Sequence, residues 1–257
     1  MISFFSGLSP VMQTLIASLA TFLITALGSA CVFLFKEINK SKLDKLLSIS
    51  AGVMLASTMF SLINPALAYA DEYKVTPWLI TSLGILSGGL LLFLGDKFYQ
   101  KNKKQNRINM VILSITLHNF PEGMAIGLAF GSAIYGVPGA TIVGALTLAL
   151  GIGIQNFPEG SAISFPLYRD GYSKWKAFLI GASTALVEPV GALLGLYLVL
   201  KLPLILPFLL AFAAGAMLYV VVVELIPESM TNEKKDLMAI FLILGFIFMM
   251  ILDISLG

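Results

Sequence analysis

The sequence contains little charge, one cysteine and one histidine. Aspartate, glutamate, lysine and arginine make up 12% of its 257 residues, whereas 58% are hydrophobic. An ordinary soluble domain is roughly 25% charged. This composition therefore excludes a soluble globular domain, a disordered chain and a nucleic-acid-binding protein, and leaves an all-α integral membrane protein. The lone Cys31 also excludes a disulfide framework and a cysteine-based metal site.

Long apolar segments, by contrast, follow one another along the whole chain. A helix needs about 20 mostly apolar residues to cross a bilayer, and eight such segments are present. They are residues 8–35, 47–70, 77–94, 109–131, 139–167, 177–200, 203–226 and 237–255. The connecting loops are short, so we expect one transmembrane domain over residues 1–257. No lysine or arginine precedes the first segment, which predicts a spanning helix rather than a cleavable signal.

The basic residues are distributed unevenly between alternate loops. All 16 lysines and arginines except Lys74 and Lys201 fall in the loops after the first, third, fifth and seventh segments. Because basic loops stay in the cytoplasm, both termini are expected outside. A compact multi-pass chain without a targeting peptide fits the plasma (inner) membrane of a bacterium.

Acidic side chains stand inside the predicted spans, where no lysine or arginine can pair with them. Glu122, Glu159 and Glu188 lie well inside the fourth, fifth and sixth spans, and Glu224 lies deep in the seventh. A charge at the bilayer centre costs at least about 2.5–3.5 kcal/mol. The missing partner is therefore expected to be a metal ion, a proton or both. The alternative is that the first three acids stay neutral and serve only packing.

The motif Asn-Phe-Pro-Glu-Gly occurs twice, once in the fourth span and once in the fifth. The two spans run in opposite directions, so the copies suggest an inverted repeat. Transporters commonly bind substrate where such repeats meet near the membrane midplane. His118 and Glu122 are four residues apart and share a helix face, and Gln155 and Glu159 repeat this spacing.

These four side chains could close around one ion. Asn119 and Asn156 could form a second site beside it, with Glu122 and Glu159 bridging both and Glu188 as a natural additional ligand. One imidazole with several carboxylates suits Zn²⁺, Cd²⁺, Fe²⁺ or Mn²⁺, whereas oxygen ligands alone favour Mg²⁺ or Ca²⁺. No catalytic cofactor is expected.

Other functions are compatible with intramembrane acids. An intramembrane metalloenzyme needs an open metal position and a general base. The HNFPE stretch lacks the second histidine of an HExxH motif, so we expect no enzyme. A metal- or proton-conducting channel could use the same carboxylates and would differ from a carrier in rate and saturation. A transporter of another substrate, such as an amine, is disfavoured by the repeated four-residue spacing of ligand groups.

At these residues the chain resembles the ZIP (Zrt/Irt-like) metal transporters, in particular a bacterial GufA-like branch. The resemblance is carried by GVMLAS in the second span, HNFPEG in the fourth, PEG in the fifth, VEPVGALLG in the sixth and AAGAMLYVVVVELIPES in the seventh. It covers essentially the whole chain. The resemblance implies import of a divalent transition metal, zinc foremost, into the cytosol through a two-metal site. It also implies a 3+2+3 helix arrangement, a homodimer and elevator-like motion.

The resemblance also implies particular ligands. The first site would be His118, Glu122, Gln155 and Glu159, and the second would be Asn119, Glu122, Asn156, Glu159 and Glu188. Glu224 would belong to the inner exit path. Many members have histidine at the position of Gln155, and some have aspartate at that of Asn156, so weaker binding is expected here. Residues 96–108 contain no histidine, so no zinc-sensing loop of the eukaryotic kind is expected there.

Overall fold

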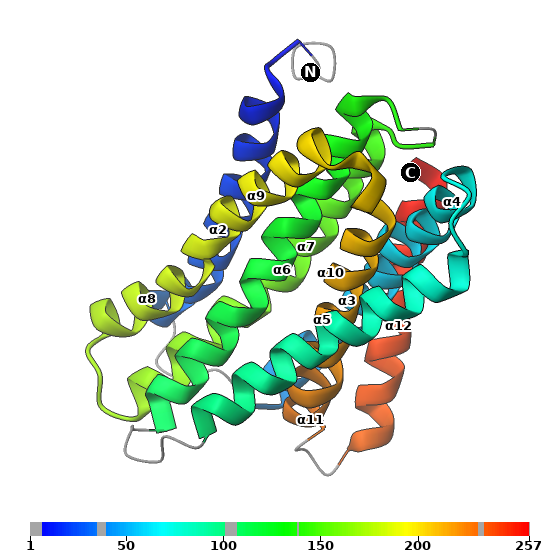
Figure 1. Ribbon diagram of the computed structural model, residues 1–257. Helices are drawn as coiled ribbons and strands as arrows, with labels where there is room; N and C mark the ends of the chain where they lie inside the picture. The colour runs from blue at the N-terminus through cyan, green and yellow to red at the C-terminus, as the bar shows by residue number, and fades with distance from the viewer. Residues whose placement is uncertain (1–6, 35–39, 101–106, 138, 231–233, 257) are drawn as a thin grey trace.

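The computed structural model describes residues 7–34, 40–100, 107–137, 139–230 and 234–256, which are helical almost throughout and include no β-strand (Figure 1). The helices are α2 (Pro10–Leu34), α3 (Lys40–Ser57), η1 (Thr58–Ile63), α4 (Asn64–Glu72), α5 (Pro77–Gln100), α6 (Arg107–Tyr135), α7 (Ile142–Arg169), α8 (Lys174–Ser183), η2 (Thr184–Leu186), α9 (Val187–Lys201), η3 (Pro203–Ile205), α10 (Leu206–Val220), η4 (Val221–Leu225), α11 (Ile226–Ser229) and α12 (Lys235–Leu256). The predicted all-α class is confirmed, and each predicted apolar range falls on one of these helices or on a continuous series of them.

Six helical segments of the described chain are long and apolar enough to cross a membrane. They are Pro10–Leu34, Lys40–Glu72, Pro77–Lys97, Lys174–Lys201, Leu206–Ser229 and Lys235–Ser255. The remaining long helices, α6 and α7, have 29 and 28 residues, or about 42 Å each at 1.5 Å per residue. Their length suffices, but the polar residues of the repeated motif lower their hydropathy. The protein is thus a multi-pass membrane protein, and the count of eight spans stays a prediction.

The helices associate in two groups. The closest pairs are α6 with α9 and α2 with α7 on one side, and α5 with α10 and α3 with α12 on the other. We call α2, α6, α7, α8 and α9 the motif group, because it carries both copies of the repeated motif. The flanking group contains α3, α4, α5, α10, α11 and α12. The two groups lie side by side in Figure 1 and meet where α6 and α7 contact α3 and α10.

Glycines allow each of the four closest pairs to touch through the backbone. Gly123 and Gly127 of α6 lie against α9, and Gly191 and Gly195 of α9 lie against α6. The other pairs also approach closely at glycines. These are Gly28 and Gly160 between α2 and α7, Gly88 and Gly215 between α5 and α10, and Gly52 and Gly245 between α3 and α12. A Cβ at any of these positions would meet the backbone of the neighbouring helix. Small residues of this kind hold membrane helices together by close packing.

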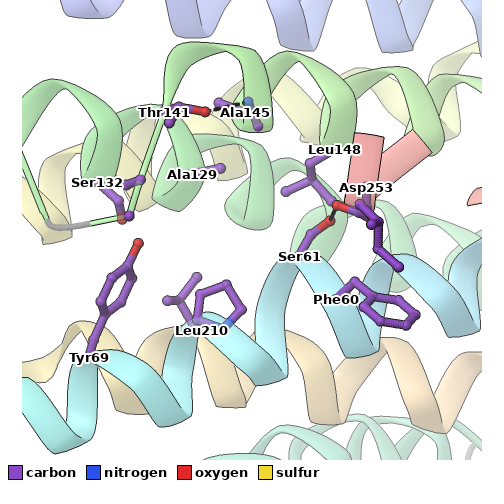
Figure 2. Close-up of a pocket in the computed structure, with 15 residues that line it drawn as sticks. Phe60, Ser61, Tyr69, Ala129, Ser132, Thr141, Ala145, Leu148, Leu210 and Asp253 are labelled. Carbon is purple, nitrogen blue, oxygen red and sulfur yellow. Dashed lines mark hydrogen bonds between the residues drawn. The ribbon is translucent and has the colours of Figure 1, made fainter. Parts of the chain in front are cut away.

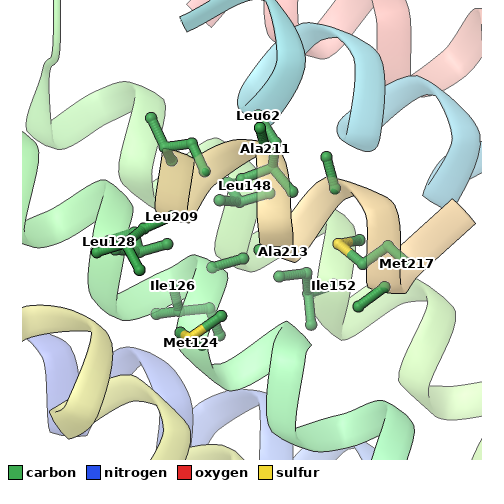
Figure 3. Close-up of a cluster of buried hydrophobic side chains, with 14 of the residues drawn as sticks. Leu62, Met124, Ile126, Leu128, Leu148, Ile152, Leu209, Ala211, Ala213 and Met217 are labelled. Carbon is green, nitrogen blue, oxygen red and sulfur yellow. The ribbon is translucent and has the colours of Figure 1, made fainter. Parts of the chain in front are cut away.

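The contact between the two groups is built differently, from larger and more adaptable side chains (Figure 3). It contains Met124, Ile126 and Leu128 of α6, Leu148 and Ile152 of α7, Leu209, Ala213 and Met217 of α10, and Leu62 of η1. Among the described glycines that touch another helix, Gly151 alone meets the opposite group, where it faces the flexible end of Met249. Within each group, helices therefore pack backbone to backbone at glycines. Between the groups, no described glycine lies against the backbone of the other group.

Two π-helical turns interrupt the flanking group. The η1 segment precedes Pro65, and the η4 segment precedes Pro227, with one residue between in each case. Proline supplies no N–H and clashes with the preceding turn, so the widened turns accommodate it. Turns of this kind often mark functional positions, and here η4 carries Glu224.

The glycine contacts predict a difference between two substitutions. Gly127→Ala should lower the stability of the detergent-solubilised protein by about 1–3 kcal/mol, because the new methyl group would press on the backbone of α9. Gly89→Ala is the control: its Cβ would lie 3.6 Å from the Gly215 carbonyl oxygen, in ordinary contact, and should stabilise α5 by about 0.5–1 kcal/mol. Thermal unfolding of both variants measures the difference, and equal melting temperatures would contradict it.

Candidate metal centre

Three of the predicted acids meet in the middle of the motif group. Glu122 of α6, Glu159 of α7 and Glu188 in the first turn of α9 are each at most 8% exposed. They interact electrostatically, Glu122 with both of the others and Glu159 also with Glu224 of η4. No lysine or arginine of the described chain is buried. The carboxylates therefore have no cationic partner within the described protein.

The two amide side chains that precede and begin the second motif reach these acids. Gln155 donates from Nε2 to Glu122 Oε1 at 2.7 Å, and Asn156 donates from Nδ2 to Glu188 Oε1 at 2.9 Å. The amide nitrogens thus face the acids, which is the orientation that an ionised carboxylate requires because it only accepts hydrogen bonds. The amide oxygens consequently point away from them.

Five buried oxygens of the predicted ligands have no hydrogen-bond partner in the described structure. They are Asn119 Oδ1, Glu122 Oε2, Gln155 Oε1, Asn156 Oδ1 and Glu159 Oε1. An unsatisfied buried polar atom is unfavourable by about 1–3 kcal/mol, so five on two neighbouring helices need an explanation. Carboxylate and amide oxygens are cation ligands, and a cation near the five would satisfy several of them together.

The acids alone do not make a closed metal site. Among the described residues, no three aspartate, glutamate, histidine or cysteine side chains come close enough to hold an ion. Amide oxygens or His118 would have to complete the coordination. His118 belongs to α6, but its side chain lies outside the described part of the structure. Its predicted role as a ligand stays a prediction.

A contribution from α2 was missed in the sequence. The Thr21 hydroxyl donates to Glu188 Oε2, and the Thr25 hydroxyl, one turn further, interacts with the same carboxylate. Both belong to a buried row of hydroxyl side chains that runs along α2 at spacings of three or four residues. The row is Thr14, Ser18, Thr21, Thr25 and Ser29. This spacing was visible in the sequence and could have indicated that one face of α2 packs against polar groups. On a helix face that contacts lipid, hydroxyl side chains would not be expected to recur in this way.

A pocket of about 190 Å³ lies between the two groups, on the side where α2 begins and α12 ends (Figures 1 and 2). Ala129 and Ser132 of α6 lie toward the end of the pocket at Tyr69 of α4, and Leu148 of α7 lies toward the other end, beside Ser61 and Asp253. Ala129 is seven residues beyond Glu122, about 10 Å along the helix. Ser61 of η1 donates to Asp253 Oδ1 of α12 at 2.7 Å beside the pocket, and Asp253 Oδ2 has no partner among the described residues.

The described central helices bury carboxylates that have no cationic partner and amide oxygens that point away from those carboxylates. In a multi-pass membrane protein, this arrangement is that of a protein that binds or transports ions. Comparison with known proteins gives the particular class: residues 100–253 match the family model described as ZIP Zinc transporter. The chain belongs to the ZIP family, as the motifs HNFPEG and PEG predicted. The family consists of transporters and not of enzymes, which removes the metalloenzyme alternative.

Individual relatives align over nearly the whole chain. Zinc transporter ZIP11 of Xenopus tropicalis is 35% identical over 98% of this chain and 99% of its own length. Zinc transporter GufA of Myxococcus xanthus is 35% identical, covering 95% of this chain and 98% of its own. Zinc transporter ZIPB of Bordetella bronchiseptica is also 35% identical, over 93% of this chain and 79% of its own.

Removing one central carboxylate should weaken metal binding. Glu159→Gln is expected to lower the zinc affinity of the purified protein by about 100-fold, because the predicted site loses a charged ligand. Loss of an outer-shell partner already lowers metal affinity by about 10–100-fold, so a direct ligand should reach at least the upper end of that range. Titration calorimetry in detergent measures the affinity. Glu72→Gln, which changes an exposed acid of α4, is the matched control and should bind zinc like the wild type. Unchanged affinity in Glu159→Gln would place the binding site elsewhere.

Proposed function

We propose that this protein imports divalent transition metals into the cytosol, with zinc as the principal substrate and Cd²⁺, Fe²⁺ and Mn²⁺ as further substrates. The observation that carries the proposal is the set of five buried ligand oxygens without partners on α6 and α7. Membership of the ZIP family and the names of the zinc-transporting relatives support the choice of zinc.

The proposed site holds two metal ions at the membrane midplane. The first position is His118, Glu122, Gln155 and Glu159, and the second is Asn119, Glu122, Asn156 and Glu159 with Glu188. Burial of the described members supports this site, since a charged side chain at membrane depth needs a compensating ion. Because two bridging carboxylates serve both positions, metal in one position should affect binding in the other.

The proposed transporter is a single domain of eight spans in a 3+2+3 arrangement, with both termini outside, in the plasma (inner) membrane. We expect a homodimer. The motif group is proposed to move as an elevator against the flanking group, carrying the metal with it. Two observations support this division: glycines hold the helices of each group backbone to backbone, and no described glycine of one group meets the backbone of the other. A moving body must be rigid inside and able to slide along its outer surface.

The proposed route follows the contact between the two groups. Metal would arrive through the pocket beside Asp253 and Ser61, since it lies about 10 Å outward of Glu122 along α6. It would leave past Glu224, which interacts electrostatically with Glu159 and lies on the flanking helix series. A channel using the same carboxylates is the alternative, and saturation of flux distinguishes the two.

Uptake into proteoliposomes tests the proposal directly. Purified wild type should take up Zn²⁺ with saturation, take up Cd²⁺, Fe²⁺ and Mn²⁺ to differing extents, and exclude Mg²⁺. Glu122→Ala and Glu159→Ala should each abolish uptake while leaving expression and membrane insertion intact, because both proposed metal positions lose a bridging ligand. Normal zinc uptake by both variants would rule out the midplane site, and flux that never saturates would favour the channel.

A large side chain in the pocket between the two groups should slow zinc uptake and leave the proposed metal site intact. Ala129→Phe places a ring where Ala129 lines the pocket, so initial zinc uptake should fall by about tenfold, the effect of a barrier about 1.4 kcal/mol higher. Zinc affinity in detergent should change little. Ala133→Phe, four residues further along α6 and not among the lining residues, is the control. Equal uptake by the two variants would show that metal arrives by another route.

A further inference from the structure

Glu188 differs from the other two central acids in how its oxygens are used. Its Oε1 accepts from Asn156 Nδ2 at 2.9 Å, and its Oε2 accepts from the Thr21 hydroxyl. Glu122 and Glu159, by contrast, each retain a buried oxygen without a partner in the described structure. Both oxygens of Glu188 therefore already accept a hydrogen bond from another helix, although the proposed site would use Glu188 beside the second position.

The backbone beneath Glu188 is also fixed. Gly123 of α6 lies directly against the Glu188 backbone, so the start of α9 cannot move away without opening the tightest helix contact of the motif group. The η2 turn immediately before α9 and Pro189 immediately after Glu188 set the direction of this helix end. Glu188 is thus held at its backbone and at both side-chain oxygens.

The group that benefits from this fixation is the Asn156 amide. An asparagine head has one acceptor and one donor side, so it can serve a cation only when the oxygen faces the metal. With Nδ2 bound to Glu188, Asn156 Oδ1 is left without a partner among the described residues. An aspartate would need no such orientation, because either of its oxygens can bind a metal.

We infer that Thr21 and Glu188 are positioning residues that orient Asn156, so that its Oδ1 and not its Nδ2 is presented to the transported metal. The inference rests on the proposed function, because it assigns roles around the proposed second position. Thr21 on α2 holds Glu188 on α9, and Glu188 holds the amide on α7. Three helices of the motif group thereby cooperate to make a neutral side chain a usable ligand.

The test compares Thr21→Val, which removes the hydroxyl at nearly constant shape, with Thr21→Ser, which keeps it. Thr14→Val is the matched control, since Thr14 is equally buried on α2 and its hydroxyl contacts no acid of the site. Zinc affinity is measured in detergent by calorimetry, and KM and kcat are measured from uptake into proteoliposomes. Each α2 variant is also made in an Asn156→Asp background.

Thr21→Val should raise KM and weaken zinc binding by about tenfold, the loss expected for one hydrogen bond to a charged group. Thr21→Ser and Thr14→Val should stay within about twofold of wild type, and kcat should change less than KM. In the Asn156→Asp background the effect of Thr21→Val should largely vanish, because coupled residues do not act additively. This combination supports the inference.

Two results would overturn it. Thr21→Val could match Thr14→Val in affinity and KM, which would show that Glu188 needs no support. Alternatively, Thr21→Val could lose as much in the Asn156→Asp background as in wild type, which would show that Thr21 does not act through the orientation of the Asn156 amide. If Thr21→Val does not elute as folded protein, Thr21→Ala against Thr14→Ala answers the same question. Absence of zinc binding and uptake in the wild type would instead overturn the proposed function.

Discussion

The described residues include no buried lysine or arginine, and the rest of this structure depends on that constraint. Glu122, Glu159 and Glu188 are buried inside the protein, and no lysine or arginine of the described chain is buried with them. Amide and hydroxyl groups satisfy some of their oxygens, but they add no positive charge. A structural role would be met by a permanent salt bridge, whereas a transported ion can enter and leave. The site is therefore arranged for a partner that is not part of the chain.

The same acids explain how the helices are grouped. Unpaired carboxylates need shelter from lipid, so α6 and α7 are surrounded by α2, α9 and the flanking group. Glycines at Gly127 and Gly195 let helices touch where side chains would keep them apart, which fixes ligands from different helices relative to one another. The contact toward α10 uses leucine, isoleucine and methionine instead (Figure 3). Such side chains can repack during movement, because methionine in particular has no single required shape.

The sequence predicted those features that depend on local spacing or on composition. Hydrophobic runs located the helices, and the repeated Asn-Phe-Pro-Glu-Gly motif located the central acids. Features that depend on contacts between distant helices could not be predicted. The spacing of hydroxyl residues along α2 was visible in the sequence, but it did not give Thr21 a partner, because a hydroxyl in a membrane helix is usually satisfied by its own backbone. The hydropathy criterion also leaves out α6 and α7, because it counts the polar residues of the repeated motif without regard to their burial among the other helices.

The pairing of amides with acids resolves an apparent weakness of the site. Gln155 and Asn156 stand where many ZIP members have histidine and some relatives have aspartate, so the two proposed metal positions would lack part of the ligand strength expected of the family. Yet each amide is fixed by a carboxylate on another helix, at 2.7 Å for Gln155 and 2.9 Å for Asn156. A ligand oriented in advance loses less entropy on binding. Weaker ligands held in place also release an ion more readily than tight ones, and a carrier must release its substrate as well as bind it.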